Sequence, residues 1–233
     1  MKLEKITKRS EAGSRRTYDD ACGLAHALDL VGERWSLMVV RELMLGPKRF
    51  SDLRADLPGI SANVLTQRLE GLEANGILIR RKLPPPASAH VYELTPWGYE
   101  AEPLIKVMGR WAARSPRHDP SLPLSAVSLM LSFRTMFDAA KAEGFDATVG
   151  IRIGEESFLA RIADGTLDLK RSPLEGADAT IAGEATSLAA VVYGGQPFDT
   201  MISVGALAVE GDRAVAERFA TLFTLPPKVE TAV

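Results

Sequence analysis

The sequence predicts an α+β protein made of two consecutive domains. Apolar residues recur at helical spacing through most of the first 115 residues, a proline-rich segment follows, and alternating strand-like patterns dominate the remainder. The chain has 233 residues, 46% of them hydrophobic and 25% charged. These values are normal for a globular protein, and the length is sufficient for two separate cores.

The first half opens with helical patterns. Apolar residues recur at helical spacing through residues 24–39, which we predict as one helix, and Gly46 followed by Pro47 ends this run. A short second helix is expected at residues 50–57, with Ser51 as its N-cap. Pro58 and Gly59 then break the chain.

The third predicted helix carries Leu65, Leu69 and Leu72 on one side. Ser61 is suited to cap its start, and the pair Asn75 and Gly76 ends it. The stretches ILIRRKL and HVYELT then predict two strands around the loop PPPASA. A final helix is expected at residues 97–112, with an apolar stripe along one face.

A linker is predicted at residues 115–123, SPRHDPSLP, because proline cannot continue a helix and favours extended backbone before it. This places the domains as follows: an N-terminal basic arm (1–18), a first domain (19–115), a linker (116–123), a second domain (124–226) and a C-terminal tail (227–233).

The second half mixes strands and helices. Residues 125–142 are helical and apolar, and ATVGIRI, SFLARIA, TLDLKRS, ADATIAG and ALAVEG alternate as strands. Asp164 followed by Gly165 predicts a hairpin turn, because both central positions of that turn favour positive φ. Residues 186–193 predict a short helix, and Asp212 is suited to cap a closing helix.

Charge is distributed unevenly between the halves. Residues 1–115 hold 18 Lys and Arg against 14 Asp and Glu, whereas residues 116–233 hold 10 against 16. This asymmetry favours contact of the first half alone with a polyanion, although random asymmetry is an equal alternative.

Two short helices with a tight turn between them and a hairpin after them form a winged helix-turn-helix. In this unit the second helix is narrow enough to enter the DNA major groove, and the wing lies over phosphate or the minor groove. Apart from Arg68, at the edge of its apolar side, the polar candidates on that helix lie opposite the leucines. The candidate DNA-binding residues are Arg49, Ser61, Asn63, Thr66, Gln67, Arg68, Arg80, Arg81, Lys82 and His90.

Each of these candidates has an alternative explanation. A polar helix residue is more often simply solvated, and Arg68 could anchor the fold instead of contacting phosphate. The basic run at 80–82 could protect an edge strand from aggregation. The helix-turn-helix pattern in the same half favours DNA.

Residues 19–113 resemble HxlR-type transcriptional regulators, relatives of the MarR group. The resemblance rests on these elements: Cys22, GERW at 32–35, Arg49, Phe50, Leu53, Gly59, Ile60, Ser61, Leu65, Arg68, Leu69, Leu72, Gly76, YELT at 92–95, Gly98 and Trp111. It implies a homodimer that binds a pseudo-palindromic operator in double-stranded DNA. Its dimer interface is expected in the first and last helices, at Leu24, Leu28, Trp97, Leu104, Ile105, Met108 and Trp111.

Cys22 is the single cysteine, so no disulfide can form within the chain and a reducing cytoplasm is the expected compartment. It lies where redox-sensing members of the family keep a cysteine. A redox role, through an intersubunit disulfide or a thiol adduct, competes with the simpler explanation of a small apolar residue.

Residues 124–224 resemble the sterol-carrier-protein-like fold through the hairpin at Asp164 and the VGALAVEGD pattern at 204–212. The resemblance implies a pocket for an apolar small molecule, with lining candidates Met130, Phe133, Phe137, Phe198 and Met201. Such side chains more often simply fill a core, and the domain could instead be an interaction module or a lipid carrier.

Catalytic and membrane functions are not expected. His26, His90 and His118 lie in unrelated elements, and no Cys/His cluster, phosphate loop or GxSxG motif is present. We therefore predict no enzyme, no cofactor and no metal site. No stretch reaches the roughly 18 apolar residues that a membrane span requires.

Overall fold

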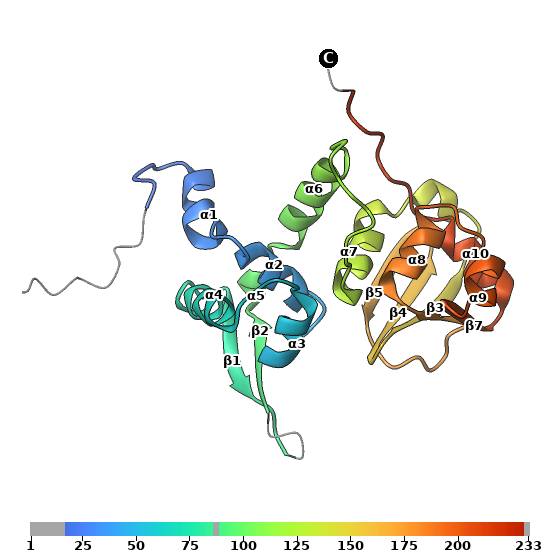
Figure 1. Ribbon diagram of the computed structural model, residues 1–233, viewed down its shortest axis with the longest axis horizontal. Coiled ribbons are helices and arrows are strands. Elements are labelled where there is room, and N and C mark those ends of the chain that lie inside the picture. Colours follow the sequence, from blue (N-terminus) through green and yellow to red (C-terminus); the bar gives the residue numbers. More distant parts are fainter. Residues whose placement is uncertain (1–16, 86–88, 231–233) are drawn as a thin grey trace, which may run out of the picture.

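The computed structural model describes residues 17–85 and 89–230. Figure 1 shows a helical region with a projecting two-stranded hairpin, followed by a region in which helices pack on a five-stranded sheet. The predicted α+β class is confirmed. Most of the predicted N-terminal arm lies outside the described residues.

The first predicted helix is in fact two helices, α1 (Gly23–Val31) and α2 (Ser36–Leu43). Gly32 follows the end of α1, and Trp35 adopts a left-handed backbone with a φ of 81°. The prediction of one helix was wrong because the apolar spacing continues across this turn. The Asn75 side chain donates a hydrogen bond of 3.1 Å to the carbonyl at the end of α1.

The next elements form the predicted helix-turn-helix and wing: α3 (Phe50–Asp56), α4 (Ala62–Ala74), β1 (Leu78–Lys82) and β2 (His90–Leu94). The N-cap of α3 is Arg49, and its backbone N–H donates to the Asp52 carboxylate at 3.3 Å. The prediction of Ser51 as the cap was wrong, since Ser51 lies within the helix and contacts Asp52.

The final helix of the first half is also divided, into α5 (Pro96–Tyr99) and α6 (Glu102–Ala113). The Thr95 side chain caps α5 by accepting from the Gly98 N–H at 3.0 Å. Gly98 packs so closely that a Cβ atom there would lie 2.1 Å from the Ile77 carbonyl oxygen. This contact holds α5 against the hairpin, whereas α6 leaves in a new direction (Figure 1).

In the second region, the sheet has the strand order β5-β4-β3-β6-β7, with β3 and β6 parallel and the other neighbours antiparallel. Asp164 and Gly165 have φ values of 51° and 68°, which confirms the predicted turn. The sequence did not predict α9. The elements are α7 (Ala126–Met136), a 3-10 turn (Ala139–Ala142), β3 (Ala147–Ile153), β4 (Glu156–Ala163), β5 (Thr166–Arg171), β6 (Ala179–Gly183), α8 (Ala185–Val192), α9 (Phe198–Ser203), β7 (Leu207–Gly211) and α10 (Arg213–Ala220).

The two regions share one continuous apolar core. Met44 and Leu45, which follow α2, are buried in the same cluster as Phe158 on the inner face of the sheet. Arg171, at the end of β5, donates to the Leu45 carbonyl at 3.1 Å. Lys228, in the predicted tail, donates to two carbonyl groups at the end of α6, each at 3.0 Å. The halves are therefore joined along a packed interface and at the C-terminus.

Candidate nucleic-acid interface

Helices α3 and α4 meet at a tight turn. Gly59 in this turn has a φ of 91°, and Ile60 is buried. The Ser61 hydroxyl accepts from the Val64 N–H at 3.3 Å, which confirms the predicted cap of α4. Leu65, Leu69 and Leu72 are buried, so α4 turns a defined opposite face outward.

The outward face of α4 carries the predicted reading residues. Asn63, Thr66 and Gln67 are exposed, and within residues 17–85 and 89–230 their side chains make no hydrogen bond. They are thus available to base edges. Arg68 is half-buried and forms an ion pair with Glu33 at 3.3 Å, which fits an anchoring role.

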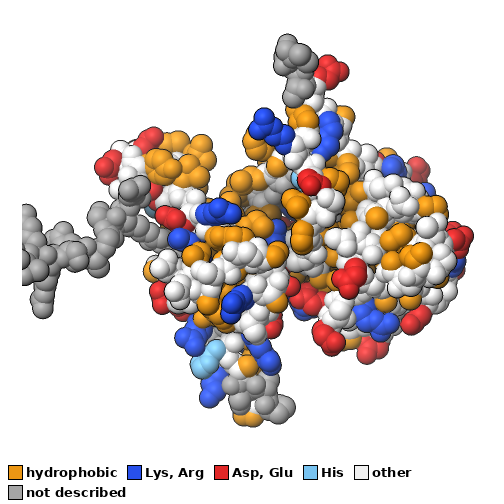
Figure 2. Space-filling view, in the orientation of Figure 1, with side chains coloured by type: hydrophobic (Ala, Val, Ile, Leu, Met, Phe, Trp, Pro, Cys, Tyr) orange, Lys and Arg blue, Asp and Glu red, His pale blue; other side chains and the backbone are white. Residues whose placement is uncertain are grey.

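The wing presents cations to solvent. Arg80, Arg81 and Lys82 are exposed on β1, and His90 pairs opposite Lys82 in the strand register. Arg81 forms an ion pair with Glu93, and Arg80 lies 6.0 Å from the centre of the Tyr92 ring. Figure 2 shows Lys, Arg and His side chains gathered on this projecting hairpin.

Arg49 is exposed at the start of α3. This position is next to the helix N-terminus, where backbone N–H groups favour phosphate. Arg49, the polar face of α4 and the basic wing therefore occupy exposed positions on consecutive elements, α3, α4 and β1. Two of the candidate cations already have a charged partner, since Arg68 pairs with Glu33 and Arg81 pairs with Glu93.

The predicted dimer residues form an exposed apolar surface. None of the 12 residues of α6, all of which are described, is buried. Ile105 is half-buried against the core and differs from the others in this respect. Figure 2 shows apolar side chains on α1 and along α6. The exposed members are Leu24, Leu28, Trp97, Leu104, Met108 and Trp111, with Val107 in addition.

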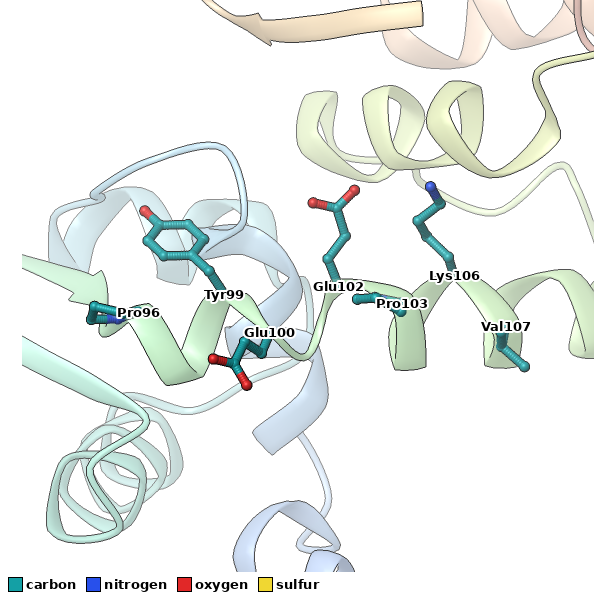
Figure 3. A pocket seen from close by; sticks show the side chains of 7 residues that line it. All are labelled: Pro96, Tyr99, Glu100, Glu102, Pro103, Lys106 and Val107. Carbon is teal, nitrogen blue, oxygen red and sulfur yellow. The ribbon is translucent and has the colours of Figure 1, made fainter. Parts of the chain in front are cut away.

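An open hollow of about 580 Å³ lies in the bend between α5 and α6. Figure 3 shows Glu102 and Lys106 pointing from α6 toward α7, with Val107 on another side of the helix. Burial, aided by the Glu93 charge, raises the pKa of Tyr99 above its ordinary value. The lining residues are Pro96, Tyr99, Glu100, Glu102, Pro103, Lys106 and Val107.

Cys22 is exposed at the N-cap of α1. The nearby backbone N–H groups of Leu24 and Ala25, at the start of α1, lower the pKa of its thiol. The Asp20 carboxylate accepts a hydrogen bond from the Cys22 backbone N–H at 2.9 Å. The local geometry favours the thiolate.

The predicted ligand-lining residues lie in three settings. Met130 and Phe133 are fully buried, and the Phe133 ring stacks on Phe223 with centroids 4.4 Å apart. Phe198 instead lines an open hollow of about 500 Å³ between α8, α9 and α10, which Phe223 and Val191 also line. Phe137 and Met201 are half-buried and pack against the core.

Among the described residues, no group of three or more His, Cys, Asp or Glu side chains could hold a metal ion. No helix in the described part of the chain is both long and apolar enough to span a bilayer.

The sequence did not single out one buried residue at this interface, Lys48. It precedes Arg49 in the loop between α2 and α3, where a lysine normally indicates solvent exposure. Its burial depends on carboxylates distant in sequence, so no local pattern could reveal it.

Comparisons with known proteins agree with this geometry. The model of the HxlR-like helix-turn-helix family matches residues 30–119. The HTH-type transcriptional regulator YodB of Bacillus subtilis is 37% identical over 86 residues, covering 37% of this chain and 77% of that protein. The uncharacterized HTH-type transcriptional regulator sll1512 of Synechocystis is 39% identical over 87 residues, covering 37% of this chain. The match spans 64% of sll1512, less than two thirds of its length.

A solved structure of B. subtilis YodB in its reduced form is 34% identical and covers 42% of this chain and 98% of that one, with a TM-score of 0.38. Residues 122–229 match a second family model, described as alkyl sulfatase C-terminal. That description is not a sterol carrier protein, so the sterol-carrier resemblance of this half stays a prediction. The identity and coverage of the first half show that the chain belongs to the family of HxlR-like helix-turn-helix proteins.

Proposed function

We propose that this chain is a homodimeric, sequence-specific transcriptional regulator that binds double-stranded operator DNA. The observation that carries the proposal is the outward face of α4, on which Asn63, Thr66 and Gln67 are exposed. Strand β1, which packs against α4, carries the exposed cations of the wing. Asn and Gln can pair bidentately with adenine, and cations in the wing can contact phosphate. The names of the curated relatives, which are HTH-type transcriptional regulators, agree with this proposal.

Dimerisation is supported by the exposed apolar surface of α1 and α6. Leu104, Met108 and Trp111 follow one another at spacings of four and three residues on α6, and such a stripe normally requires a partner. A two-fold dimer would present two copies of α4 to half-sites about one helical turn apart. This predicts a pseudo-palindromic operator.

The test compares Gln67→Ala with Arg80→Ala on a duplex that the wild-type chain selects from a random pool. Gln67→Ala should cost about 1–3 kcal/mol at one base position and relax specificity there. Arg80→Ala should weaken all DNA about equally and reduce the salt slope by about one. Fluorescence anisotropy at several salt concentrations measures both effects.

Arg152→Ala serves as the control, because Arg152 is an exposed cation on the outer face of the sheet. It should leave DNA binding close to that of the wild type. Equal, sequence-independent losses from Gln67→Ala and Arg80→Ala would show that α4 is not the reading helix.

The C-terminal half is proposed to bind an apolar small molecule that modulates DNA affinity. The support is the hollow that Phe198 and Phe223 line together with Val191 and Val192. Its other lining residues include charged groups of both signs, Lys141, Arg213, Asp199 and Glu217. Native mass spectrometry of the purified chain tests for a retained molecule. Empty protein with no thermal shift from fatty or aromatic compounds would favour the alternative of an interaction module.

A redox response through Cys22 is a second candidate, favoured by the exposure and the lowered pKa of its thiol. A solved relative, HypR, is described as a redox regulator in its oxidized form. With one cysteine in each chain, oxidation would form an intersubunit disulfide or a mixed disulfide with a small thiol. Oxidant should change operator binding of the wild type but not of Cys22→Ser, and equal responses would remove this candidate.

A further inference from the structure

A buried ionic cluster lies where the helix-turn-helix region meets the sheet. Lys48 is only 4% exposed. Its Nζ atom lies 2.8 Å from a Glu156 oxygen and 3.6 Å from a Glu42 oxygen, and it also contacts the Asp56 carboxylate. Glu42 belongs to α2, Asp56 ends α3, and Glu156 begins β4. One ammonium group therefore joins three elements from both halves of the chain.

The charges of this cluster balance. Arg41 donates to Glu42 at 2.9 Å, and Arg171 donates to Glu156 at 3.2 Å. Burial by itself lowers the pKa of Lys48, but its hydrogen bonds to Asp56 and Glu156 and the charge of Glu42 outweigh burial and raise that pKa. Lys48 is thus charged at neutral pH. Removing one partner leaves a poorly solvated charge without compensation.

Two further hydrogen bonds cross between the halves beside Lys48. The fully buried Glu42 accepts from the Ser125 hydroxyl, at the start of α7, at 2.8 Å. Arg171 donates to the Leu45 carbonyl at 3.1 Å. The contact between the halves therefore combines the shared apolar core with a network of several polar bonds, and such a network fixes the relative position of the groups that it joins.

The same lysine is bonded to the DNA-binding elements through its backbone. The Lys48 N–H donates to the Tyr92 carbonyl at 3.0 Å, and the Tyr92 N–H donates back at 2.9 Å. Tyr92 belongs to the wing strand β2, and Asp56 lies at the end of α3. The position of Lys48 is thus coupled to that of the wing and of α3 together.

We propose that the Lys48 cluster, defined as Arg41, Glu42, Lys48, Asp56, Glu156 and Arg171, lets the C-terminal sheet set the position of α3 and the wing for DNA binding. Glu156 is then a positioning residue for DNA recognition, although it lies on the sheet. The proposal rests on the DNA-binding function proposed above. It also provides a route by which a structural change at the ends of β4 and β5 alters DNA affinity.

The direction in which one substitution changes DNA affinity distinguishes a positioning role of Glu156 from a simple effect of its charge. Removing a carboxylate makes the protein more positive, which by charge alone strengthens binding to a polyanion. Removing Glu156 also releases Lys48 and Arg171 from their partner, which disturbs α3 and the wing. Positioning therefore predicts weaker specific binding, the opposite of the charge effect.

The experiment compares Glu156→Ala and Glu156→Gln with Glu155→Ala. Glu155 is the adjacent exposed acid in the turn before β4, and its side chain has no ion pair with any described residue. On a duplex selected by the wild-type chain, Glu156→Ala should weaken binding about three- to tenfold with the same salt slope. Glu156→Gln retains a hydrogen-bond acceptor for Lys48 and should recover part of that loss. Glu155→Ala should bind as well as the wild type or slightly more tightly.

Hydrogen exchange of the folded proteins provides a second measurement that does not require DNA. The amides of Lys48 and Tyr92 should exchange faster in Glu156→Ala than in the wild type. In Glu155→Ala their exchange rates should equal those of the wild type. Unchanged exchange at these amides, or unchanged or tighter binding of the selected duplex by Glu156→Ala, overturns the proposal. A wild-type chain that selects no duplex instead overturns the proposed function, while the exchange measurement still decides whether Glu156 holds the wing.

Discussion

Helices α6 and α7 are neighbours that pack against each other, yet they use their apolar residues in opposite ways. Helix α7 buries seven of its 11 residues, whereas none of the 12 residues of α6, all described, is buried. Trp111 of α6 is 74% exposed and Phe133 of α7 is fully buried. An apolar stripe thus identifies a helix without saying whether this chain or another covers it.

The largest effect is expected from Phe133→Ala, because α7 forms the centre of the core. The Phe133 ring stacks on Phe223 and meets the edge of Phe219 at a centroid distance of 5.7 Å. We expect the free energy of unfolding to fall by about 3–5 kcal/mol, through lost burial and the cavity left behind. Denaturant unfolding measures this change.

Val204→Ala is the control for this measurement, because Val204 is 70% exposed. It should change the free energy of unfolding by less than about 0.5 kcal/mol. A loss below about 1 kcal/mol for Phe133→Ala would mean that α7 is not the centre of the core.

The second prediction tests whether a second chain covers the exposed apolar side chains of α6. Trp111→Ala should weaken association of two chains by about 2–4 kcal/mol, because exposed tryptophans at such interfaces commonly dominate binding. Sedimentation at several concentrations should then show monomer where the wild type is dimeric, and operator affinity should fall with it. Leu122→Ala, which removes an exposed apolar side chain of the predicted linker, should sediment like the wild type. Equal sedimentation of Trp111→Ala and the wild type would show that the exposed apolar surface of α6 is not the dimer interface.

Features determined by neighbouring residues could be predicted from the sequence. Ser61 and Asp212 cap α4 and α10, and Asp164 with Gly165 forms the expected hairpin turn. In each case a side chain bonds a backbone group two or three residues away, or a local φ preference decides the turn. The polar face of α4 followed from helical geometry in the same way.

Features determined by distant residues could not be predicted. Trp35 interrupts the first helical run with a left-handed backbone, although the apolar period continues through it. Lys48 is buried because Glu156, more than 100 residues away, supplies a carboxylate. Met130 and Phe133 satisfied the composition of a ligand pocket, but both are fully buried, and Phe133 packs against Phe219 of the last helix. Tertiary partners decide such cases, and they leave no local pattern.

A smaller loss of stability is expected when the polar contact that joins α6 to α7 is removed. Arg134 of α7 forms an ion pair with Glu102 of α6 at 2.8 Å and donates to the Leu169 carbonyl at 3.0 Å. Both charged side chains are about one quarter exposed, which screens the pair. Arg134→Met, which keeps most of the side-chain volume, should reduce the free energy of unfolding by about 1–2 kcal/mol. A stability equal to that of the wild type would show that apolar packing alone holds α6 in place.

The smallest effect should come from Arg110, which makes the exposed contact between the same two helices. Its guanidinium lies 3.4 Å from the Thr135 carbonyl oxygen, at the upper limit of a hydrogen bond, and its side chain is largely solvated. Arg110→Ala should therefore change the free energy of unfolding by less than about 0.5 kcal/mol. Because Arg110 and Arg134 have different partners, the double substitution should equal the sum of the single ones in denaturant unfolding. A coupling above about 0.5 kcal/mol would show that the two arginines hold α6 as one unit, and the exposed end of α6 would then be less independent of α7 than its apolar surface indicates.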